Sequence, residues 1–441
     1  MTRFTEGRIA SSWGSVRHVP QAIARPSYRD QLGDLFKQRA GREVLAVGCR
    51  RSYGDTVLND RGCLIEMELL DRIISFDAEA GVLRAEAGLT LDAALQIIVP
   101  HGWFFHTTPG TRFVTLGGAI ANDVHGKNHH RVGSFGLSVR KIGLLRSDDG
   151  LLEIDRDLHR ELFFATIGGL GQTGLIVWAE VELTRIPSTD LLVERLPFGS
   201  VSEFFKLAEA SDSEAEHIVA WIDCASVSAP GRGIFQRANW RPEGGYRPHS
   251  SKLAAAVPFT MPSILLNNLT VKTFNAAYWR LEQRHRGAVS EHYSKFFYPL
   301  DAIGNWNRLY GRRGFYQYQC VLPFSAAEAS VTEMLRQTSK AREGSFLAVL
   351  KTLGSIPSIG YLSFPRHGVT LALDFPNRGT STASLFERLD EIVRDAGGRL
   401  YPAKDGRMSR DMFRSGYENM ETFVRYVDPA FSSDFWRRVS I

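Results

Sequence analysis

Apolar residues recur along the chain at two spacings, one that predicts helices and one that predicts strands. Leu32, Leu35 and Phe36 share one helical face ahead of the apolar run at 44–47, so we expect a helix followed by a buried strand. Residues 176–183 alternate between apolar and polar side chains, which indicates a half-buried strand. The same criteria predict strands at 63–67, 82–87, 139–145, 217–225, 315–322, 345–351, 368–375 and 399–405, and helices at 91–98, 159–166 and 202–210.

Two further helices are predicted from capping boxes, in which a serine and a glutamate three residues later bind free amides of the first helical turn. Ser325 with Glu328 predicts one start, and Ser384 with Glu387 predicts the other. Both helices are expected to cover a sheet.

The chain changes character near Pro187, where the density of glycine drops. Strands backed by helices after this point predict an α+β fold with an antiparallel sheet. We expect two packed domains in 441 residues. The first consists of 1–187 and a returning segment at 396–441, and the second of 188–395.

Three glycine-rich segments interrupt the periodic pattern. Residues 109–136 interleave glycines with polar side chains and show almost no helical or strand periodicity, so we interpret them as a loop that holds a flat, anionic cofactor. Residues 48–55, GCRRSYGD, follow a predicted strand and form either an anion-binding nest or an ordinary turn. Residues 168–174, GGLGQTG, lead into a strand and not a helix, which excludes a Rossmann fingerprint there.

Charge and cysteine content narrow the class of protein only a little. Lys and Arg number 53 against 48 Asp and Glu, which favours anionic substrates or headgroups but is too weak an excess to predict nucleic-acid binding. The four cysteines are scattered, so we expect free thiols in a reducing compartment. The first residues lack the apolar core of a signal peptide, and no apolar run is long enough to span a membrane. A cytoplasmic protein is therefore expected.

Two patterns in the second half have two interpretations each. Residues 253–271 are apolar but broken by prolines, and form either a buried connector or a surface that accepts a lipid tail or dips into a bilayer interface. Gln317 and Gln319 share one strand face, which either binds a polyhydroxylated ligand or meets solvent.

The candidate chemistry is redox chemistry. No Gly-x-Ser-x-Gly motif supports a serine hydrolase. His125, His129 and His130 lack a partnered carboxylate or cysteine set, so we expect no metal site and a structural role for at least one of them. A cofactor loop facing Lys351 and Lys404 would form a site between the domains.

The segments GCRRSYGD, PGTRFVTLGGAIANDVHGKNHH, GGLGQTG and RLYPAKD together closely resemble the vanillyl-alcohol oxidase type of FAD-dependent oxidoreductase. Within that family the chain is similar to the decaprenylphosphoryl-β-D-ribose 2′-oxidase group, over nearly its whole length. The resemblance implies a two-domain FAD-binding fold with an antiparallel-sheet substrate domain. It also implies non-covalent FAD, because Arg51 stands where many relatives carry the histidine that bonds the ring.

The resemblance also implies roles for individual residues. The catalytic candidates are Lys404, whose pKa burial beside a flavin would lower, and His125 as the alternative base. The implied cofactor-binding residues are Gly48, Cys49, Arg50, Arg51, Ser52, Tyr53, Gly54, Asp55, Gly110, Thr115, Leu116, Gly117, Gly118, Asn122, Asp123, Val124, His125, Ile176 and Tyr401. The implied substrate-binding residues are Tyr53, Lys127, Gln317, Gln319, Lys351, Thr370 and Lys404.

Four positions depart from the pattern of the group. Arg50 replaces a usual glycine, which leaves the shape of the first glycine turn open. Thr370 and Ala372 replace an asparagine and a cysteine, and Phe297 replaces a tyrosine. These changes leave the exact substrate open and predict insensitivity to inhibitors that need that thiol.

The implied reaction oxidises the ribose 2′-hydroxyl of a polyprenylphosphoryl-β-D-ribose to a 2′-keto product, the first half of epimerisation to an arabinose donor. A short-chain NAD(P)H-dependent keto-reductase would complete it, and a quinone or another acceptor would reoxidise the flavin. Peripheral contact with the inner membrane is implied as well. The alternatives are a soluble sugar-alcohol or aldonolactone oxidase that uses oxygen, and a non-catalytic flavoprotein or lipid-binding module.

Overall fold

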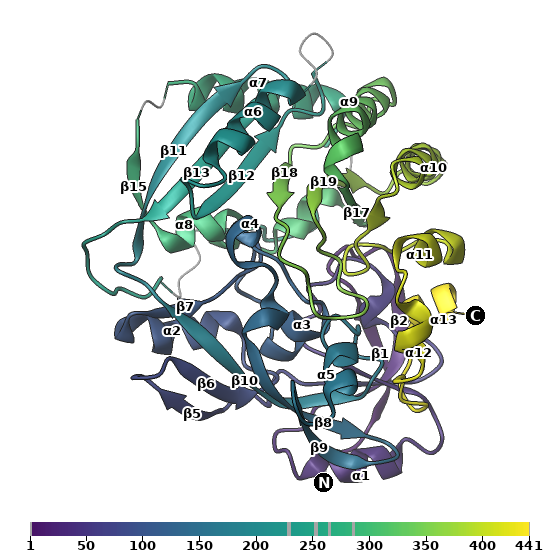
Figure 1. The fold of residues 1–441 in the computed structure, drawn as a ribbon. Coiled ribbons are helices and arrows are strands. Elements are labelled where there is room, and N and C mark those ends of the chain that lie inside the picture. Colours follow the sequence, from purple (N-terminus) through teal and green to yellow (C-terminus); the bar gives the residue numbers. More distant parts are fainter. Residues whose placement is uncertain (1, 227–230, 251–254, 263–265, 285–286, 441) are drawn as a thin grey trace.

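Three sheets organise the chain, and the computed structural model describes residues 2–226, 231–250, 255–262, 266–284 and 287–440 of it (Figure 1). The first sheet has the order β1-β2-β4-β3 and is parallel at β2–β4 and β3–β4. Its strands are β1 (Thr5–Ser11), β2 (His18–Ala24), β3 (Val44–Val47) and β4 (Cys63–Glu66), with α1 (Gln31–Gln38) between β2 and β3.

The second sheet is antiparallel and lies beside the first in the lower half of Figure 1. Its order is β5-β6-β10-β8-β9, and β7 pairs with the far end of β10. The strands are β5 (Ile73–Asp77), β6 (Val82–Glu86), β7 (Trp103–Phe105), β8 (Val139–Arg146), β9 (Gly150–Asp155) and β10 (Leu175–Arg185). Its helices are α2 (Leu91–Ile98), α3 (Leu116–Ala121), α4 (His129–Val132) and α5 (Arg160–Thr166).

The third sheet has eight strands in the order β15-β11-β13-β12-β18-β19-β17-β20 and occupies the upper half of Figure 1. All its pairings are antiparallel. The strands are β11 (Asp190–Phe198), β12 (His217–Ile222), β13 (Gly233–Trp240), β15 (Val289–His292), β17 (Phe315–Leu322), β18 (Ala348–Leu353), β19 (Gly368–Pro376) and β20 (Arg399–Leu400). Two further short strands, β14 (Ala255–Ala256) and β16 (Ile303–Gly304), pair in parallel with each other.

Helices cover one face of the third sheet and bury the largest apolar core. That core joins α6 (Val201–Ser211), α9 (Phe324–Lys340) and α10 (Thr380–Asp395) to the sheet through residues such as Phe204, Leu335 and Leu389. The other face of the sheet is turned toward the first half of the chain. Helix α7 (Asn268–Glu282) contacts β11 and β13, and α8 (Tyr293–Phe297) contacts β11 and β15. The opposite face is therefore free to form a site.

The last forty residues return to the first half of the chain as α11 (Arg410–Gly416), α12 (Met420–Val424) and α13 (Asp434–Ser440). The Val44 N–H donates to Ala430 O at 2.7 Å, which joins this segment to β3. Arg438 forms ion pairs with Asp55 at 2.7 Å and with Asp405 at 3.0 Å. The C-terminal segment is thus bound directly to the residues that follow the first glycine turn.

Several sequence predictions are confirmed by the helix and strand boundaries. The helix after Thr90 forms as α2, and the Thr90 hydroxyl accepts a hydrogen bond from the Ala93 N–H at 3.1 Å. The alternating segment at 176–183 lies within β10, and the strand at 315–322 is β17. The mixed α+β architecture with an antiparallel sheet is also confirmed.

Both predicted capping boxes are wrong. Helix α9 begins at Phe324 directly after Pro323, with no side-chain cap. Helix α10 begins at Thr380, four residues before Ser384, because Gly379 turns the chain at a φ of 66° and the Thr382 hydroxyl accepts from the Arg378 N–H. A capping pattern inside a longer helix carries no start signal.

Two other predictions need correction, and a third lies partly outside the described residues. Only Arg399–Leu400 of the predicted strand 399–405 pairs with β17, because the next residues form a turn in which the Lys404 and Asp405 N–H groups donate to Tyr401 O. The cofactor loop 109–136 contains two helices, α3 and α4, and is not irregular throughout. Of the apolar segment 253–271, residues 253–254 and 263–265 lie outside the described part of the chain.

Candidate active site

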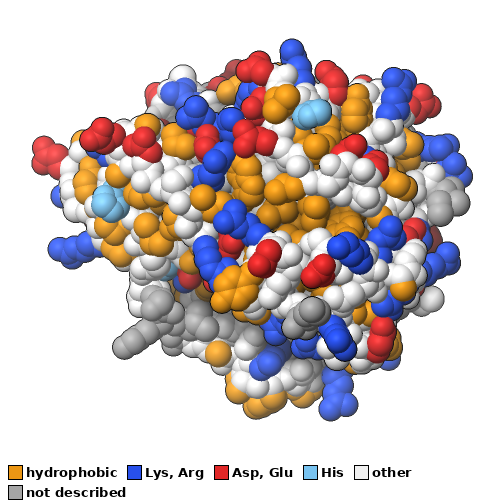
Figure 2. Space-filling model, turned by 90° about the horizontal axis from the view of Figure 1, so that it is seen from below, with side chains coloured by type: hydrophobic (Ala, Val, Ile, Leu, Met, Phe, Trp, Pro, Cys, Tyr) orange, Lys and Arg blue, Asp and Glu red, His pale blue; other side chains and the backbone are white. Residues whose placement is uncertain are grey.

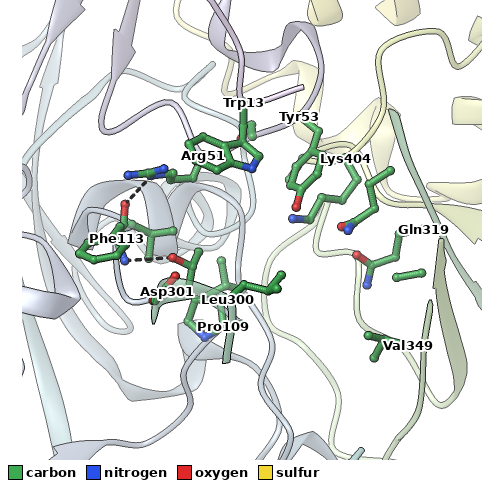
Figure 3. A pocket seen from close by; sticks show the side chains of 18 of the residues that line it. Trp13, Arg51, Tyr53, Pro109, Phe113, Leu300, Asp301, Gln319, Val349 and Lys404 are labelled. Carbon is green, nitrogen blue, oxygen red and sulfur yellow. Dashed lines mark hydrogen bonds between the residues drawn. The ribbon is translucent and has the colours of Figure 1, made fainter. Parts of the chain in front are cut away.

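A cavity of about 1250 Å³ lies between the glycine-rich segments and the open face of the third sheet. On one side it is lined by the turn after β3 and by the loop around α3, and on the other by side chains of β12, β17 and β18. The turn at 401–404 closes the space between them (Figure 3). The predicted site between the two halves of the chain therefore corresponds to a cavity large enough for a dinucleotide.

The first glycine turn is packed so tightly that two of its glycines exclude a side chain. A Cβ on Gly48 would lie 2.1 Å from Thr115 Oγ1, and a Cβ on Gly54 would lie 1.5 Å from Asp405 O. Arg50 has a φ of 46°, the left-handed conformation that favours glycine, and its guanidinium forms an ion pair with Glu66. The turn thus keeps a conformation suited to glycine although arginine occupies the position.

The backbone of this turn is available to an anion. Within the part of the chain that the structure describes, the N–H groups of Cys49, Arg50 and Arg51 donate to no protein acceptor. All three residues line the cavity. Successive free amides of this kind bind phosphate oxygens, so the turn fits the pyrophosphate of the implied FAD.

Arg51 forms the wall next to this turn. Its Nε donates to Phe113 O at 3.3 Å, and its guanidinium carbon lies 4.3 Å from the centre of the Trp13 ring (Figure 3). Burial lowers the pKa of Arg51. Arg51 thus lines the cavity at the position where the resemblance implies that many relatives carry the histidine that bonds the flavin ring.

The loop around α3 forms the floor of the cavity. Thr115 caps this helix by accepting from the Gly118 N–H at 3.2 Å, and a Cβ on Gly117 would lie 2.9 Å from the Ala87 side chain. Asn122 lines the cavity, and its buried Oδ1 has no hydrogen-bond partner among the described residues. An unsatisfied buried acceptor is a point where a flat polar ligand would donate.

His125 lies at the centre of a polar cluster on the substrate side. Its Nδ1 is 3.2 Å from Lys351 Nζ, and its Nε2 is 3.3 Å from Gln319 Nε2. Burial, together with the positive charge of Lys351, holds the pKa of His125 well below its usual range. Burial and the nearby Lys404 lower the pKa of Lys351 to about 7. His125 is therefore neutral, and both ring nitrogens already have a neighbour.

Lys404 has a different environment from His125. Its Nζ lies 4.0 Å from the centre of the Tyr53 ring, and it has no hydrogen-bond partner within the described residues. Burial lowers the pKa of Lys404 to about 8, although Asp374 acts in the opposite direction. An amine that lines the cavity and has no hydrogen-bond partner among the described residues is the best placed group for exchanging a proton with a ligand.

Asp374 is the only acidic side chain that faces Lys404 from β19 among the described residues of that strand. It accepts from Gln317 Nε2 at 2.6 Å, and burial raises its pKa to about 7. Residues 370, 372 and 374 alternate onto one face of β19, opposite the two glutamines of β17. The same alternation could have identified Asp374 from the sequence.

Lys127 forms a second cationic point, farther from the glycine turn. Its Nζ donates to Phe296 O and lies over the Phe296 ring. Burial, Lys351 and Arg195 lower its pKa to about 7. Arg195 also lines the cavity and is held by Glu282 at 3.2 Å and Glu291 at 2.9 Å. The cavity therefore contains positive groups at both ends of its polar face.

Most of the implied site residues line this one cavity. Those from the first half are Gly48, Cys49, Arg50, Arg51, Ser52, Tyr53, Gly110, Thr115, Gly117, Gly118, Asn122, Val124, His125, Lys127 and Ile176. Those from the second half are Gln317, Gln319, Lys351, Tyr401 and Lys404. Segments separated by more than 300 residues of sequence are thus brought together.

Five implied residues lie behind the cavity wall and do not line it. They are Gly54, Asp55, Leu116, Asp123 and Thr370. Asp55 binds Arg438, Asp123 accepts from Ser134 and from the Gly136 N–H, and the Thr370 hydroxyl accepts from Gln319. Their side chains are not part of the cavity lining, and their implied roles in binding stay predictions.

Sequence reasoning missed the aromatic and acidic wall of the cavity. Trp13, Phe113, Leu300 and Asp301 all line it (Figure 3). Asp301 accepts from the Arg112 N–H at 2.8 Å, and burial raises its pKa. Phe113 lies within the predicted cofactor loop but was not singled out there. No periodicity marks Trp13, Leu300 or Asp301, which reach the cavity only through the tertiary fold.

The remaining two histidines of the loop have structural contacts. His129 Nδ1 accepts from the Gly354 N–H at 3.2 Å, and His130 Nε2 lies 2.9 Å from Ala215 O. In the described part of the chain, no group of three or more His, Cys, Asp or Glu side chains has the geometry to hold a metal.

The chain is similar to several known proteins. The FAD binding domain family matches residues 20–155. Decaprenylphosphoryl-beta-D-ribose oxidase of Mycolicibacterium smegmatis is 34% identical over 99% of this chain and 96% of its own length. An uncharacterized protein of Streptomyces coelicolor is 29% identical over 80% of this chain and 100% of its own. L-gulono-1,4-lactone dehydrogenase of Mycobacterium tuberculosis is 36% identical over 41% of each chain.

Proposed function

Since the chain belongs to the vanillyl-alcohol oxidase type of FAD-dependent oxidoreductases, in the group of decaprenylphosphoryl-β-D-ribose oxidases, we propose that it oxidises the ribose 2′-hydroxyl of a polyprenylphosphoryl-β-D-ribose. The product is the 2′-keto sugar. The observation that carries this proposal is the position of Lys404, which is half-buried, lines the cavity beside Tyr53 and has no hydrogen-bond partner among the described residues.

The similarity supports this substrate class over a soluble lactone or sugar alcohol. The match to the ribose oxidase covers 99% of the chain and so includes the strands that carry Gln317, Gln319 and Lys351. The match to the lactone dehydrogenase covers 41%. A shared substrate side of the cavity is therefore supported only for the ribose oxidase.

FAD would be held by the residues of the first half of the chain that line the cavity. The free amides of Cys49, Arg50 and Arg51 would bind its pyrophosphate, and Gly117 and Asn122 would contact its ring system. When bound, FAD accepts the hydride that leaves the carbinol carbon. The tight packing at Gly48 and Gly54 fixes the turn before the cofactor arrives, so little ordering is needed on binding.

Lys404 would take the hydroxyl proton. With a pKa of about 8, part of the Lys404 population is free amine at neutral pH, and the side chain lines the cavity. The C–H bond breaks as hydride, the O–H proton passes to Nζ, and the C=O bond forms. His125 is the weaker candidate because Lys351 and Gln319 already occupy the neighbourhood of its two nitrogens.

Lys127 and Lys351 would hold the phosphate of the substrate as point charges. Both are half-buried, and partial removal from solvent together with nearby cations lowers the pKa of each to about 7. A bound phosphate would restore the protonated form of both lysines. Gln317 and Gln319 would orient the sugar hydroxyls from β17, with Thr370 positioning Gln319 from behind.

Other parts of the proposal concern the surroundings of the enzyme. A short-chain NAD(P)H-dependent reductase would reduce the keto product, and a quinone or another acceptor would reoxidise the flavin. We propose that the enzyme is cytoplasmic and makes peripheral contact with the inner membrane. Among the described residues, no helix is long and apolar enough to cross a bilayer. Residues 1–187 with 396–441 would form the FAD domain and 188–395 the substrate domain.

Anaerobic reduction of the FAD-loaded enzyme tests the function. Addition of a polyprenylphosphoryl ribose should bleach the yellow flavin absorption, whereas gulonolactone and xylitol should not. Bleaching by the soluble polyols but not by the lipid-linked sugar would replace this proposal with the soluble oxidase. A folded protein that cannot be reconstituted with FAD would contradict both.

A further inference from the structure

Exposed apolar side chains gather where α7 and β16 border the cavity. Phe274 of α7 and Ile303 of β16 both line the cavity and are 52% and 40% exposed, so they lie at its mouth. Leu269 and Leu281 of α7 and Phe259 do not line it and are 74%, 55% and 61% exposed. We call these five residues the mouth surface.

The mouth surface continues the inner wall of the cavity. Val271 and Tyr278 line the cavity from one side of α7, and Phe274 and Leu281 follow the adjacent stripe of the same helix at a spacing of seven residues. The Phe274 ring packs on Phe346, which also lines the cavity, with centroids 5.9 Å apart. An apolar chain that leaves the cavity along this wall would therefore remain in apolar surroundings up to the protein surface.

The segment opposite α7 is fixed to the cavity wall as well. Ala255 of β14 pairs with Ile303 of β16, and the Val257 N–H donates to Gly304 O at 2.8 Å. Arg308 donates to Val257 O and to Pro258 O. Phe259 follows directly, so its exposed ring is presented by a bound segment and not by a free end.

The charged side chains of α7 that face solvent are all basic. Its charged residues are Lys272, Arg280 and Glu282. Glu282 is buried and binds Arg195 at 3.2 Å, and Arg284, just past the helix, is exposed. By contrast, the face seen from below in Figure 2 intermixes acidic and basic side chains. Apolar side chains flanked by cations, with no exposed anion on the helix, are typical of surfaces that bind anionic bilayers.

We propose that the mouth surface docks on an anionic lipid bilayer and receives the substrate tail directly from it. The inference rests on the proposed function, because a polyprenyl-phosphate sugar resides in a membrane. Leu269, Leu281 and Phe259 enter the acyl region, and Lys272, Arg280 and Arg284 contact the headgroups. The polyprenyl chain stays partly in the bilayer while the sugar passes between Phe274 and Ile303 to Lys404.

Vesicle sedimentation of the FAD-loaded enzyme tests the docking without turnover. The wild-type protein is expected to sediment with phosphatidylglycerol vesicles, less with phosphatidylcholine vesicles, and less as salt rises. For the Leu269→Glu/Leu281→Glu variant, the partition coefficient between buffer and vesicles should fall on the order of tenfold, because two charges replace the inserted side chains. Leu151→Glu is the matched control: Leu151 is 59% exposed and lies on β9, at the other end of the molecule in Figure 1.

A kinetic readout separates docking from catalysis. With a short-chain substrate in detergent, the Leu269→Glu/Leu281→Glu variant should reduce its flavin at the wild-type rate, since neither leucine lines the cavity. With a long-chain substrate in vesicles it should be slower by the same factor as its loss of partition. Failure of the short-chain reaction in the wild type would contradict the function and leave the sedimentation result standing.

Three outcomes would overturn the docking proposal. They are a wild-type protein that does not bind anionic vesicles, a variant that binds as well as the wild type, and a loss of binding in the Leu151→Glu control equal to that of the variant. Light scattering tests whether a second copy of the chain binds the mouth surface instead. A wild-type protein that is a dimer, together with a variant that is a monomer, would show this.

Discussion

The ammonium nitrogen of Lys404 lies over the ring of Tyr53, 4.0 Å from its centre. The two residues come from opposite ends of the chain and are held together by the backbone, since the Tyr53 N–H donates to Ala403 O at 2.9 Å. The proposed base and the proposed cofactor turn therefore move as one unit. Substitutions at these positions should separate catalysis from cofactor binding.

Replacing Lys404 by Ala should abolish turnover and leave FAD bound. General-base removal costs about 10²- to 10⁴-fold in rate, and the amides of the glycine turn are unaffected. Stopped-flow reduction of the flavin measures the rate, and the absorption of the purified protein measures its flavin content. Lys295→Ala is a suitable control because Lys295 also lines the cavity but is bound to Glu291. Wild-type reduction rates in Lys404→Ala would remove this lysine from the mechanism.

The charge of Asp374 should set the pH at which Lys404 becomes active. Asp374 raises the pKa of Lys404, so its neutralisation in Asp374→Asn lets burial lower that pKa further below 8. The rising limb of flavin reduction against pH is then expected at lower pH than in the wild type. Tyr310→Phe removes a contact with the same carboxylate at 3.5 Å. Because that contact lowers the pKa of Asp374, its loss reduces the charge only in part, and the limb should move less than in Asp374→Asn. An unchanged limb in Asp374→Asn would show that the titrating group is not Lys404.

The buried histidines should make the fold sensitive to acid. Burial lowers the pKa of both His129 and His217 to about 3. Because these folded-state pKa values lie below the unfolded value near 6.5, the unfolded chain binds more protons between them. The free energy of unfolding should therefore fall as pH drops from 6.5 toward 3. Urea unfolding at several pH values measures this, and His217→Phe should show a shallower fall than the wild type.

Arg50 should be replaceable by glycine but not by valine. Its φ of 46° is accessible to glycine without cost, whereas a β-branched residue there costs on the order of 1–3 kcal/mol. FAD titration of the apoprotein should give an affinity within a few-fold of the wild type for Arg50→Gly. For Arg50→Val we expect a loss of about tenfold or more. Equal affinities of the two variants would show that the backbone conformation of the turn does not control binding.

The four native thiols should be unreactive in the folded protein. Cys63, Cys224 and Cys320 are buried, and burial raises the pKa of Cys49 to about 12. Iodoacetamide should modify none of them within minutes, as mass spectrometry can check. Ala372→Cys places a thiol on the cavity wall near the cluster of lysines, which should lower its pKa and make it react first. Modification of Cys49 before the introduced thiol would contradict this order.

Local patterns predicted the elements that depend on neighbours in sequence. Thr90 and the alternation at 315–322 correctly indicated α2 and β17, because capping and side-chain alternation are local effects. The start of α10 was misplaced because Gly379 and Thr382 begin it through contacts that the Ser384 pattern does not reflect.

The site divides in the same way. Residues of the glycine-rich segments could be found from the sequence, since a ligand-binding backbone requires glycine wherever a Cβ would clash, as at Gly48. Trp13 and Asp301 could not be found, because only the tertiary fold brings them to the cavity. Asp374 could have been predicted from the sequence, because it shares a strand face with Thr370 and is the cross-strand neighbour of Gln317.

The binding of α13 to the glycine turn places one cation between two acidic residues of the site wall. Arg438 joins Asp55, two residues after Tyr53, to Asp405, the residue after Lys404. Loss of this guanidinium would leave two neighbouring carboxylates to repel each other between the proposed base and the cofactor turn. The C-terminal helix thus supplies the charge that lets these two parts of the site lie side by side.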